Sequence, residues 1–266
     1  MDRLMTWTIG IMASLGYLFL LAPMFIIVPM SLGQTNELEF PPRELSIELY
    51  RAFFSDPSWW GSAVQSVRVA TATTALALFL GVPSAYVIAR GPRYLRKILS
   101  ILFMAPILVP VVVVGLGMYL QLSRLGLVET TIGLIFAHTV MATPYVIISI
   151  TAGLRHLDAS LETAASIMGA SDAKVFFSIV LPQIVPSIVV AGLFAFLISF
   201  DEVVVAYFVT GPTTMTLPVK MYSAIRWEIS PVIAAVGTGL TLVSSFGCIL
   251  ALWLQPKEPK ALTANG

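Results

Sequence analysis

Six long apolar runs alternate with short polar segments along this chain. They cover residues 8–30, 60–89, 98–122, 132–153, 186–209 and 231–254. A helix needs about 20 apolar residues to cross the roughly 30 Å hydrocarbon core of a bilayer, so each run is long enough for one span. The pattern predicts an all-α fold, a polytopic membrane helix bundle of about six transmembrane helices. We expect a single domain over residues 1–266 with a flexible tail at 256–266.

Composition supports the membrane setting and excludes several function classes. Hydrophobic residues make up 58% of the chain and charged residues 11%, and the mean hydropathy is +0.91. A soluble globule of this length carries far more charge. The net charge of +1 gives no basic excess for binding nucleic acid. The first apolar run is too long to be a removed signal peptide, so we expect it to be a helix.

The positions of Lys and Arg predict which side of the membrane each connection occupies. With a cytoplasmic amino terminus, the inside segments hold nine basic residues and the outside segments hold five. The excess comes chiefly from RGPRYLRK at residues 90–97, which has four basic residues and no acid. The positive-inside rule therefore predicts that both termini, and the connection between the fourth and fifth runs, are cytoplasmic.

That connection, the docking loop of residues 154–181, is polar, helical in pattern and broken by a glycine. Asp158 or Ser160 can cap one short helix and Ser171 a second, while Gly169 allows a turn that a side chain would obstruct. An apolar stripe on the second helix would face a partner or the bundle, and consists of Val175, Phe176 and Ile179. An ordinary connecting loop is the alternative, but it would need none of these elements in this register.

Three charged residues interrupt the apolar runs. Asp201 and Glu202 lie in the fifth run and Arg68 in the second, each at about 12 Å depth if a helix rises about 1.5 Å per residue. One arginine against two carboxylates leaves a negative charge that would favour a cation in a translocation pathway. An ion pair that only fixes helix packing is an equal alternative for Arg68, but it accounts for only one carboxylate.

The sequence carries no recognisable catalytic or metal-binding motif. No lysine follows a glycine, so the phosphate-binding G-x-x-x-x-G-K-[ST] loop is absent and we expect no nucleotide hydrolysis by this chain. His138 and His156 have no Cys or carboxylate at metal-ligand spacing. Although His138 lies in the fourth run, where an ionisable group is a functional candidate, we expect a neutral imidazole bonded to a neighbouring helix.

The docking loop resembles the cytoplasmic EAA signature of permease subunits of bacterial ABC importers. The spacing of Ala164-Ala165, Gly169 and Ile179-x-Leu181-Pro182 matches that signature. Where the family usually has its acidic residue this chain has Thr163, and the nearest carboxylate is Glu162. In that family the segment forms two short helices in a cleft of the ATPase. The resemblance implies an ATPase-coupling role for Glu162, Thr163, Ala164, Ala165, Gly169, Ile179, Leu181 and Pro182.

A second resemblance begins at Ser199. The run SFDEVVVAYFVTGPTTMTLPVKMYSAIRWEISP is similar to inner-membrane permeases of spermidine/putrescine-type importers, and the likeness covers nearly the whole chain. It implies the type I ABC importer permease fold and a polyamine-like cation as solute. An opine, an amino-acid-like compound or another small solute is the alternative. A different class is a secondary transporter or channel, in which Asp201 and Glu202 would carry coupling ions.

The same resemblance implies the partners. They are a second permease subunit in a heterodimer, two ATPase subunits that bind ATP and Mg²⁺, and a periplasmic or lipid-anchored solute-binding protein. We expect the binding protein to dock on the outer loops, residues 31–57 and 211–228. Membrane lipid surrounds the bundle. This chain itself is expected to be non-enzymatic and to hold no cofactor or metal.

Overall fold

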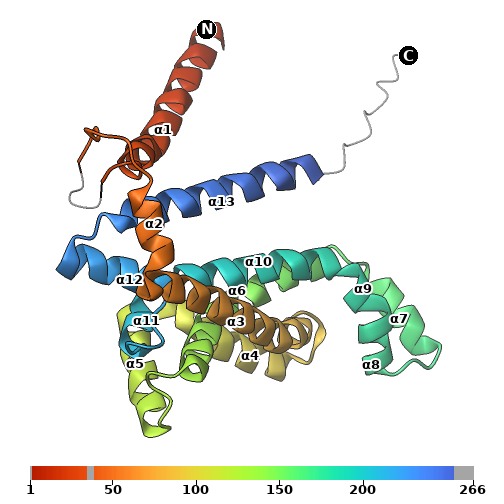
Figure 1. Ribbon diagram of the computed structural model, residues 1–266. Helices are drawn as coiled ribbons and strands as arrows, with labels where there is room; N and C mark the ends of the chain where they lie inside the picture. The colour runs from red at the N-terminus through yellow and green to blue at the C-terminus, as the bar shows by residue number, and fades with distance from the viewer. Residues whose placement is uncertain (1, 35–38, 255–266) are drawn as a thin grey trace. The chain divides into compact units, whose positions relative to one another are not determined.

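The computed structural model describes residues 2–34 and 39–254, so the predicted tail at 256–266 lies outside the described residues. Across those two ranges the regular elements are all helices (Figure 1). The predicted all-α class is therefore confirmed. Backbone contacts divide the chain into two compact units, residues 1–57 with 224–266, and residues 58–223.

The first unit combines helices from both ends of the chain. They are α1 (Asp2–Met30), α2 (Glu48–Ser55), the single π-turn η2 (Ala224–Glu228) and α13 (Val232–Leu254). The helices α1 and α13 match the first and sixth predicted spans. The Thr238 hydroxyl donates to the Ile27 carbonyl at 3.3 Å, and a Cβ at Gly237 would lie 2.6 Å from the Ile27 side chain. Gly237 therefore permits close packing of α13 against α1.

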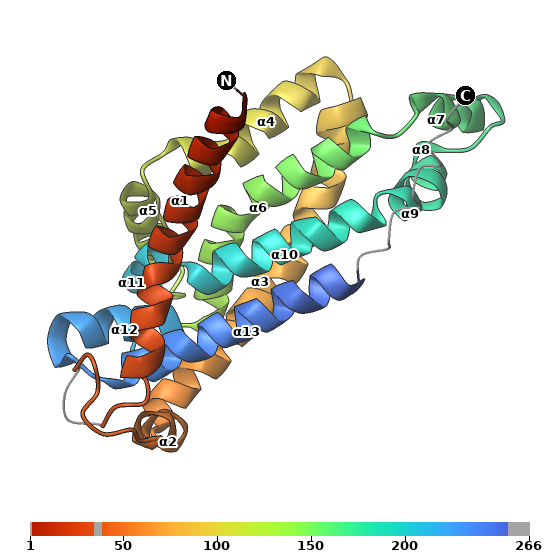
Figure 2. The same cartoon turned by 90° about the horizontal axis from the view of Figure 1, so that it is seen from above.

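Three helices form the framework of the second unit: α3 (Pro57–Arg90), α6 (Thr131–Arg155) and α10 (Val185–Asp201). Figures 1 and 2 show α6 and α10 side by side, and they pack closely along their length. A Cβ at Gly153 of α6 would collide with the Ser187 side chain of α10, so a small residue is needed there. The core is filled by buried residues that include Ala77, Val146, Ile150, Ala191 and Ala195.

The third predicted span is not one helix. Residues 98–122 belong to two helices that meet at an angle of 110°, α4 (Arg93–Leu108) and α5 (Val111–Arg124). Val109 and Pro110 are extended between them, because proline lacks a backbone N–H and disfavours helical geometry in the residue before it. The helices α3 and α6 nevertheless continue through Pro83 and Pro144.

The fifth predicted span is also interrupted. The helix α10 ends at Asp201, Glu202 is extended, and α11 (Val204–Val209) follows. A short loop then leads to α12 (Leu217–Ser223). The prediction of a continuous helix from 186 to 209 was wrong, because it relied on hydropathy alone and two adjacent carboxylates end the helix.

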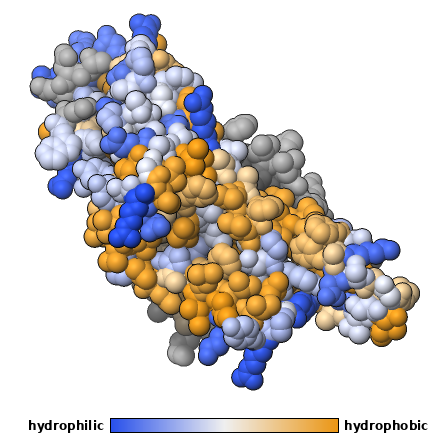
Figure 3. Space-filling model, turned by 90° about the horizontal axis from the view of Figure 1, so that it is seen from below, coloured by the Kyte–Doolittle hydropathy of each residue, from blue (hydrophilic) through white to orange (hydrophobic). Residues whose placement is uncertain are grey.

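The apolar helices of the described part agree with a multi-pass membrane protein. Three of them, α1, α3 and α6, are long and apolar enough to span a membrane, and each bent pair counted as one span gives up to five. Much of the face drawn in Figure 3 is hydrophobic, with hydrophilic residues in separate patches. Large side chains such as Leu108, Val113 and Leu197 are exposed. Such a surface needs lipid or partner helices to cover it.

Between α6 and α10 the chain leaves the framework of the second unit and forms four short helical pieces. They are α7 (Ala159–Ile167), α8 (Asp172–Val175), the π-turn η1 (Phe176–Val180) and α9 (Leu181–Gln183). Figures 1 and 2 show them projecting beyond the ends of α6 and α10. The docking loop is therefore a folded helix-turn-helix rather than an irregular connection.

Candidate functional site

The first helix of the docking loop begins at a side-chain cap. The Asp158 carboxylate accepts a hydrogen bond of 2.9 Å from the Ser160 backbone N–H, as the sequence predicts. The same backbone hydrogen bond, helped by the Ser160 side chain, lowers the pKa of Asp158 below its usual value. Because the carboxylate also lies at the positive end of the helix, it stays ionised and keeps α7 fixed at its start.

The turn that follows α7 depends on a left-handed backbone at Gly169. The φ of Gly169 is +86°. The Ala170 N–H donates to the Ala165 carbonyl at 3.1 Å, and the Gly169 N–H donates to the Ser166 carbonyl at 3.0 Å. These two bonds form a Schellman cap. No heavy atom lies within 4 Å of a Cβ built at Gly169. A side chain at this position would therefore strain the turn through the positive φ rather than through a collision, which agrees with the expectation that a side chain would obstruct it.

The second helix of the docking loop starts at Ser171, whose hydroxyl accepts from the Lys174 N–H at 3.4 Å, as predicted. Its apolar stripe faces the bundle: Val175 is buried, and Phe176 and Ile179 pack against the same core. Leu181 joins that core as well. The sequence left open whether the stripe meets a partner or the bundle, and within this chain it packs on the bundle.

The outer surface of the docking loop carries different apolar residues, which the sequence analysis missed. Ile167 is 82% exposed and Met168 is 83% exposed, immediately before the glycine turn. Phe177 is exposed as well. Two large apolar side chains next to each other at the tip of a rigid, capped turn are typical of a surface that a partner covers. Their position directly before Gly169 was the available signal.

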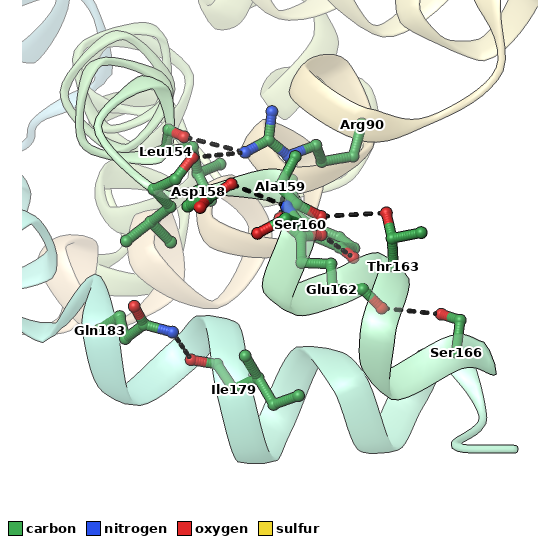
Figure 4. Close-up of polar contacts among 12 residues, drawn as sticks. Arg90, Leu154, Asp158, Ala159, Ser160, Glu162, Thr163, Ser166, Ile179 and Gln183 are labelled. Carbon is green, nitrogen blue, oxygen red and sulfur yellow. Dashed lines mark hydrogen bonds and ion pairs between the residues drawn. The ribbon is translucent and has the colours of Figure 1, made fainter. Parts of the chain in front are cut away.

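Each member of the EAA-like segment has a defined orientation in α7. Ala165 is buried against the core, whereas Ala164 and Thr163 are exposed. The Thr163 hydroxyl donates to the Ala159 carbonyl at 3.1 Å (Figure 4). The Thr163 hydroxyl therefore has its hydrogen-bond partner within its own helix.

Glu162 points the other way, into the bundle. Its carboxylate accepts from the Arg90 Nε at 3.0 Å and from the Tyr86 hydroxyl at 3.0 Å. The Arg90 guanidinium also donates to the carbonyls of Leu154 and Leu157 at 3.2 and 3.3 Å (Figure 4). The Glu162 side chain is only 13% exposed. We call this Arg90–Glu162 pair, with Tyr86, the clamp; it ties α7 to the ends of α3 and α6.

After the docking loop the chain passes through α9, which contains Pro182, and bends into α10 at Ile184. The proline is exposed, and the preceding π-turn carries a bond from the Leu181 N–H to the Phe176 carbonyl. The run from Asp172 to Gln183 then meets α10 at 75°. A proline removes one helix donor, and a local π-turn is a usual way to accommodate that loss.

The three charged residues of the predicted pathway are not brought together. Asp201 ends α10 and is exposed, and the Glu202 carboxylate accepts from the Val205 N–H at 2.8 Å, which caps α11. Arg68 lies exposed on α3, and within residues 2–34 and 39–254 no ion pair joins it to either acid. The pathway role of the three residues stays a prediction.

Two further polar features of the second unit concern His138 and metal binding. The His138 Nδ1 lies 2.9 Å from the Ser199 hydroxyl of α10, in a fully buried position. The expected hydrogen bond to a neighbouring helix is therefore present. In the described part of the chain, no cluster of three or more His, Cys, Asp or Glu residues could hold a metal ion.

Comparison with known proteins places this arrangement among transport proteins. Residues 77–257 match the family model described as "Binding-protein-dependent transport system inner membrane component". The chain is 34% identical to the putrescine transport system permease protein PotI of Escherichia coli (strain K12), over 96% of this chain and 92% of that protein. It is 25% identical to the spermidine/putrescine transport system permease protein PotC of the same strain, over 94% of each chain.

The chain is also similar to a permease of a molybdenum transport system and, in fold, to a chain of a solved ABC transporter. The molybdenum transport system permease protein ModB of Mycobacterium bovis is 30% identical over 72% of this chain and 77% of its own. The fold resembles a chain of a bacterial ABC transporter that imports the acidic polysaccharide alginate, with a TM-score of 0.73 and 15% identity, over 94% of this chain and 96% of that chain.

Proposed function

This chain belongs to the family of binding-protein-dependent transport system inner membrane components, and from this premise we propose that it forms half of an ABC importer's translocation path. The chain is a multi-pass inner-membrane transport subunit, not an enzyme. The other half of the path is a second permease subunit, in a heterodimer. A secondary transporter or channel, the alternative of a different class, has no support from these relatives.

The geometry of the docking loop carries the proposal of coupling to a separate ATPase. It is a helix-turn-helix capped at three points, and Ile167 and Met168 are exposed at its tip. A cleft in one ATPase subunit would cover this tip. The importer would contain two ATPase subunits, and they would bind the ATP and Mg²⁺. Thr163, which stands where the family usually has its acidic residue, and Ala164 lie on the exposed side of α7 and would meet the ATPase. This chain would hold no cofactor of its own.

The clamp supports the orientation in the membrane that we propose. Because Arg90 contacts Glu162, Leu154 and Leu157, the basic segment at residues 90–97 and the docking loop share one end of the second unit. The positive-inside rule supports a cytoplasmic position for that end. Both termini would then be cytoplasmic, and the outer loops at 31–57 and 211–228 would receive a periplasmic or lipid-anchored binding protein.

A polyamine is the solute best supported by the relatives and by charge. The two polyamine permeases match nearly the whole chain. Asp201 is exposed at the break between α10 and α11, where its charge would attract a cation in the pathway. An opine or an amino-acid-like solute remains the alternative, since the binding protein selects the solute that reaches the permease.

Uptake by reconstituted transporter tests the proposal. The chain is combined in proteoliposomes with its partner permease, ATPase and binding protein, and the uptake of labelled putrescine, spermidine, octopine and arginine is compared. We expect putrescine or spermidine uptake that requires both ATP and the binding protein. Uptake driven by an ion gradient without ATP would refute the importer assignment, and ATP-driven uptake of octopine alone would refute the polyamine assignment.

A further inference from the structure

A basic pocket lies between the ends of α3, α4 and α6, beside the clamp. Its volume is about 280 Å³, and it is lined by three arginines from three different helices, Arg90, Arg96 and Arg155, together with Ser100 and Thr151. All three arginines line this one pocket, while Glu162 is the one carboxylate bonded to any of them in the described residues. The pocket therefore keeps a surplus positive charge.

Two of the three arginines are available to a ligand. Arg90 is engaged by Glu162 and by two carbonyls, whereas the hydrogen bond of the Arg96 side chain goes to the Gly91 carbonyl at a long 3.4 Å. Arg155 makes no side-chain hydrogen bond or ion pair within the described part of the chain. The Thr151 Oγ1 is buried and has no hydrogen-bond partner there either. These groups are suited to an anion with several acceptor oxygens.

A second cavity of about 270 Å³ adjoins the basic pocket and is apolar. It shares Ile88, Ser100, Thr151 and Arg155 with the first cavity and continues to Met104, Ile147 and Ile148. Met104 lies two helical turns beyond Arg96 in α4, and Ile147 lies two turns before Arg155 in α6. At about 1.5 Å per residue, the apolar part extends roughly 12 Å from the charged end. The combined cavity is charged at one end and apolar at the other.

We propose that this combined cavity binds an anionic phospholipid of the cytoplasmic leaflet. Arg96 and Arg155 donate to the phosphate, the Ser100 and Thr151 hydroxyls donate to its remaining oxygens, and one acyl chain lies along Met104 and Ile148. Basic pockets between transmembrane helices at the cytoplasmic side are suited to anionic headgroups. The leaflet assignment rests on the proposed orientation, but the binding itself does not depend on which solute is transported.

Retention of lipid by the purified transporter tests this site. The full chain, assembled with its partners, is titrated in detergent with phosphatidylglycerol, with phosphatidylcholine of the same acyl chains, and with inorganic phosphate, and bound lipid is counted by native mass spectrometry. We expect preferential retention of phosphatidylglycerol. Arg96→Gln/Arg155→Gln should weaken it roughly tenfold or more, because two charge-assisted contacts to phosphate are lost.

Two variants on the same helices provide the controls. Arg93→Gln/Lys97→Gln removes two charges from α4 outside the pocket and should leave retention unchanged. Ala152→Phe should block the apolar half and reduce lipid retention while inorganic phosphate binding persists. Equal retention of both lipids, unchanged phosphatidylglycerol binding in Arg96→Gln/Arg155→Gln, or binding of phosphate with no preference for the lipid would each overturn the proposal. None of these outcomes depends on uptake, so failure here is distinct from failure of the importer assignment.

Discussion

Two adjacent residues of α7, Glu162 and Thr163, face different sides of the docking loop. Successive residues of a helix project about 100° apart, so a shift of one position moves a carboxylate from the partner side to the bundle side. Glu162 consequently pairs with Arg90 inside this chain. An ion pair from this glutamate to the ATPase would require the clamp to open.

The clamp should carry movement of the docking loop to α3 and α6. The pair is partly exposed, so its contribution to stability is small, about 1 kcal/mol or less. Glu162→Gln and Arg90→Gln should instead loosen coupling, raising the ATP hydrolysed per solute imported roughly threefold, since such linkages carry about 0.5–2 kcal/mol. Arg90→Gln should raise this ratio more than Glu162→Gln does, because it also removes the hydrogen bonds to the carbonyls of Leu154 and Leu157.

The matched control for the clamp is Arg93→Gln, a neighbouring arginine outside it. The double variant Glu162→Gln/Arg90→Gln should be no worse than Arg90→Gln alone, because both changes remove the same contact. Strictly additive increases in the ATP-to-solute ratio would contradict a shared role, and so would an equal effect of Arg93→Gln.

At the scale of elements, the breaks at Pro110 and Glu202 each divide a continuous apolar run into two helices. A hydrophobic window counts apolar residues and does not test whether the backbone can remain helical, so two spans were predicted as continuous. Both breaks had local signals in the sequence. Pro110 favours an extended backbone at Val109 before it, and Glu202 can accept a hydrogen bond from a backbone N–H in the first turn of a new helix. The other apolar runs, which lack such an acidic pair, form the helices expected of them.

The two acids at the second break should respond differently to neutral replacement. Glu202→Gln keeps an acceptor oxygen for the Val205 N–H, whereas Glu202→Leu loses the cap at about 1 kcal/mol and should lower the melting temperature by a few degrees. Asp201→Asn should leave stability unchanged and reduce putrescine uptake, because the amide keeps size but loses charge. Thermal unfolding and uptake measured on the same preparations separate the two roles.

Arg68 offers a further check on the same pair. Since no ion pair joins it to either acid within the described residues, Arg68→Leu and Asp201→Asn should have additive effects on assembly. Recovery of assembly in the combined variant would show that they do pair in the membrane. Unchanged putrescine uptake by Asp201→Asn would count against a pathway role.

At the scale of the whole molecule, the sequence predicts the helical membrane fold and the position of the docking loop, but not its orientation. Spacing alone identifies Gly169, and cap chemistry identifies Asp158 and Ser171. The inward turn of Glu162 depends on Arg90, which is 72 residues away in the chain, and no local pattern encodes that contact. The basic pocket is also a product of tertiary packing, since its arginines come from three helices.

The central claim is that the docking loop links this chain to an ATPase, and a pair of glycine variants tests it most directly. Gly169 and Gly126 have φ of +86° and +67°, and neither has an atom within 4 Å of an added Cβ. Valine should therefore impose similar backbone strain at both, about 1–2 kcal/mol. The measurement is co-purification of the ATPase together with ATP-driven uptake. The account predicts that Gly169→Val lowers both roughly tenfold while Gly126→Val leaves them intact; full co-purification and uptake in Gly169→Val would contradict it.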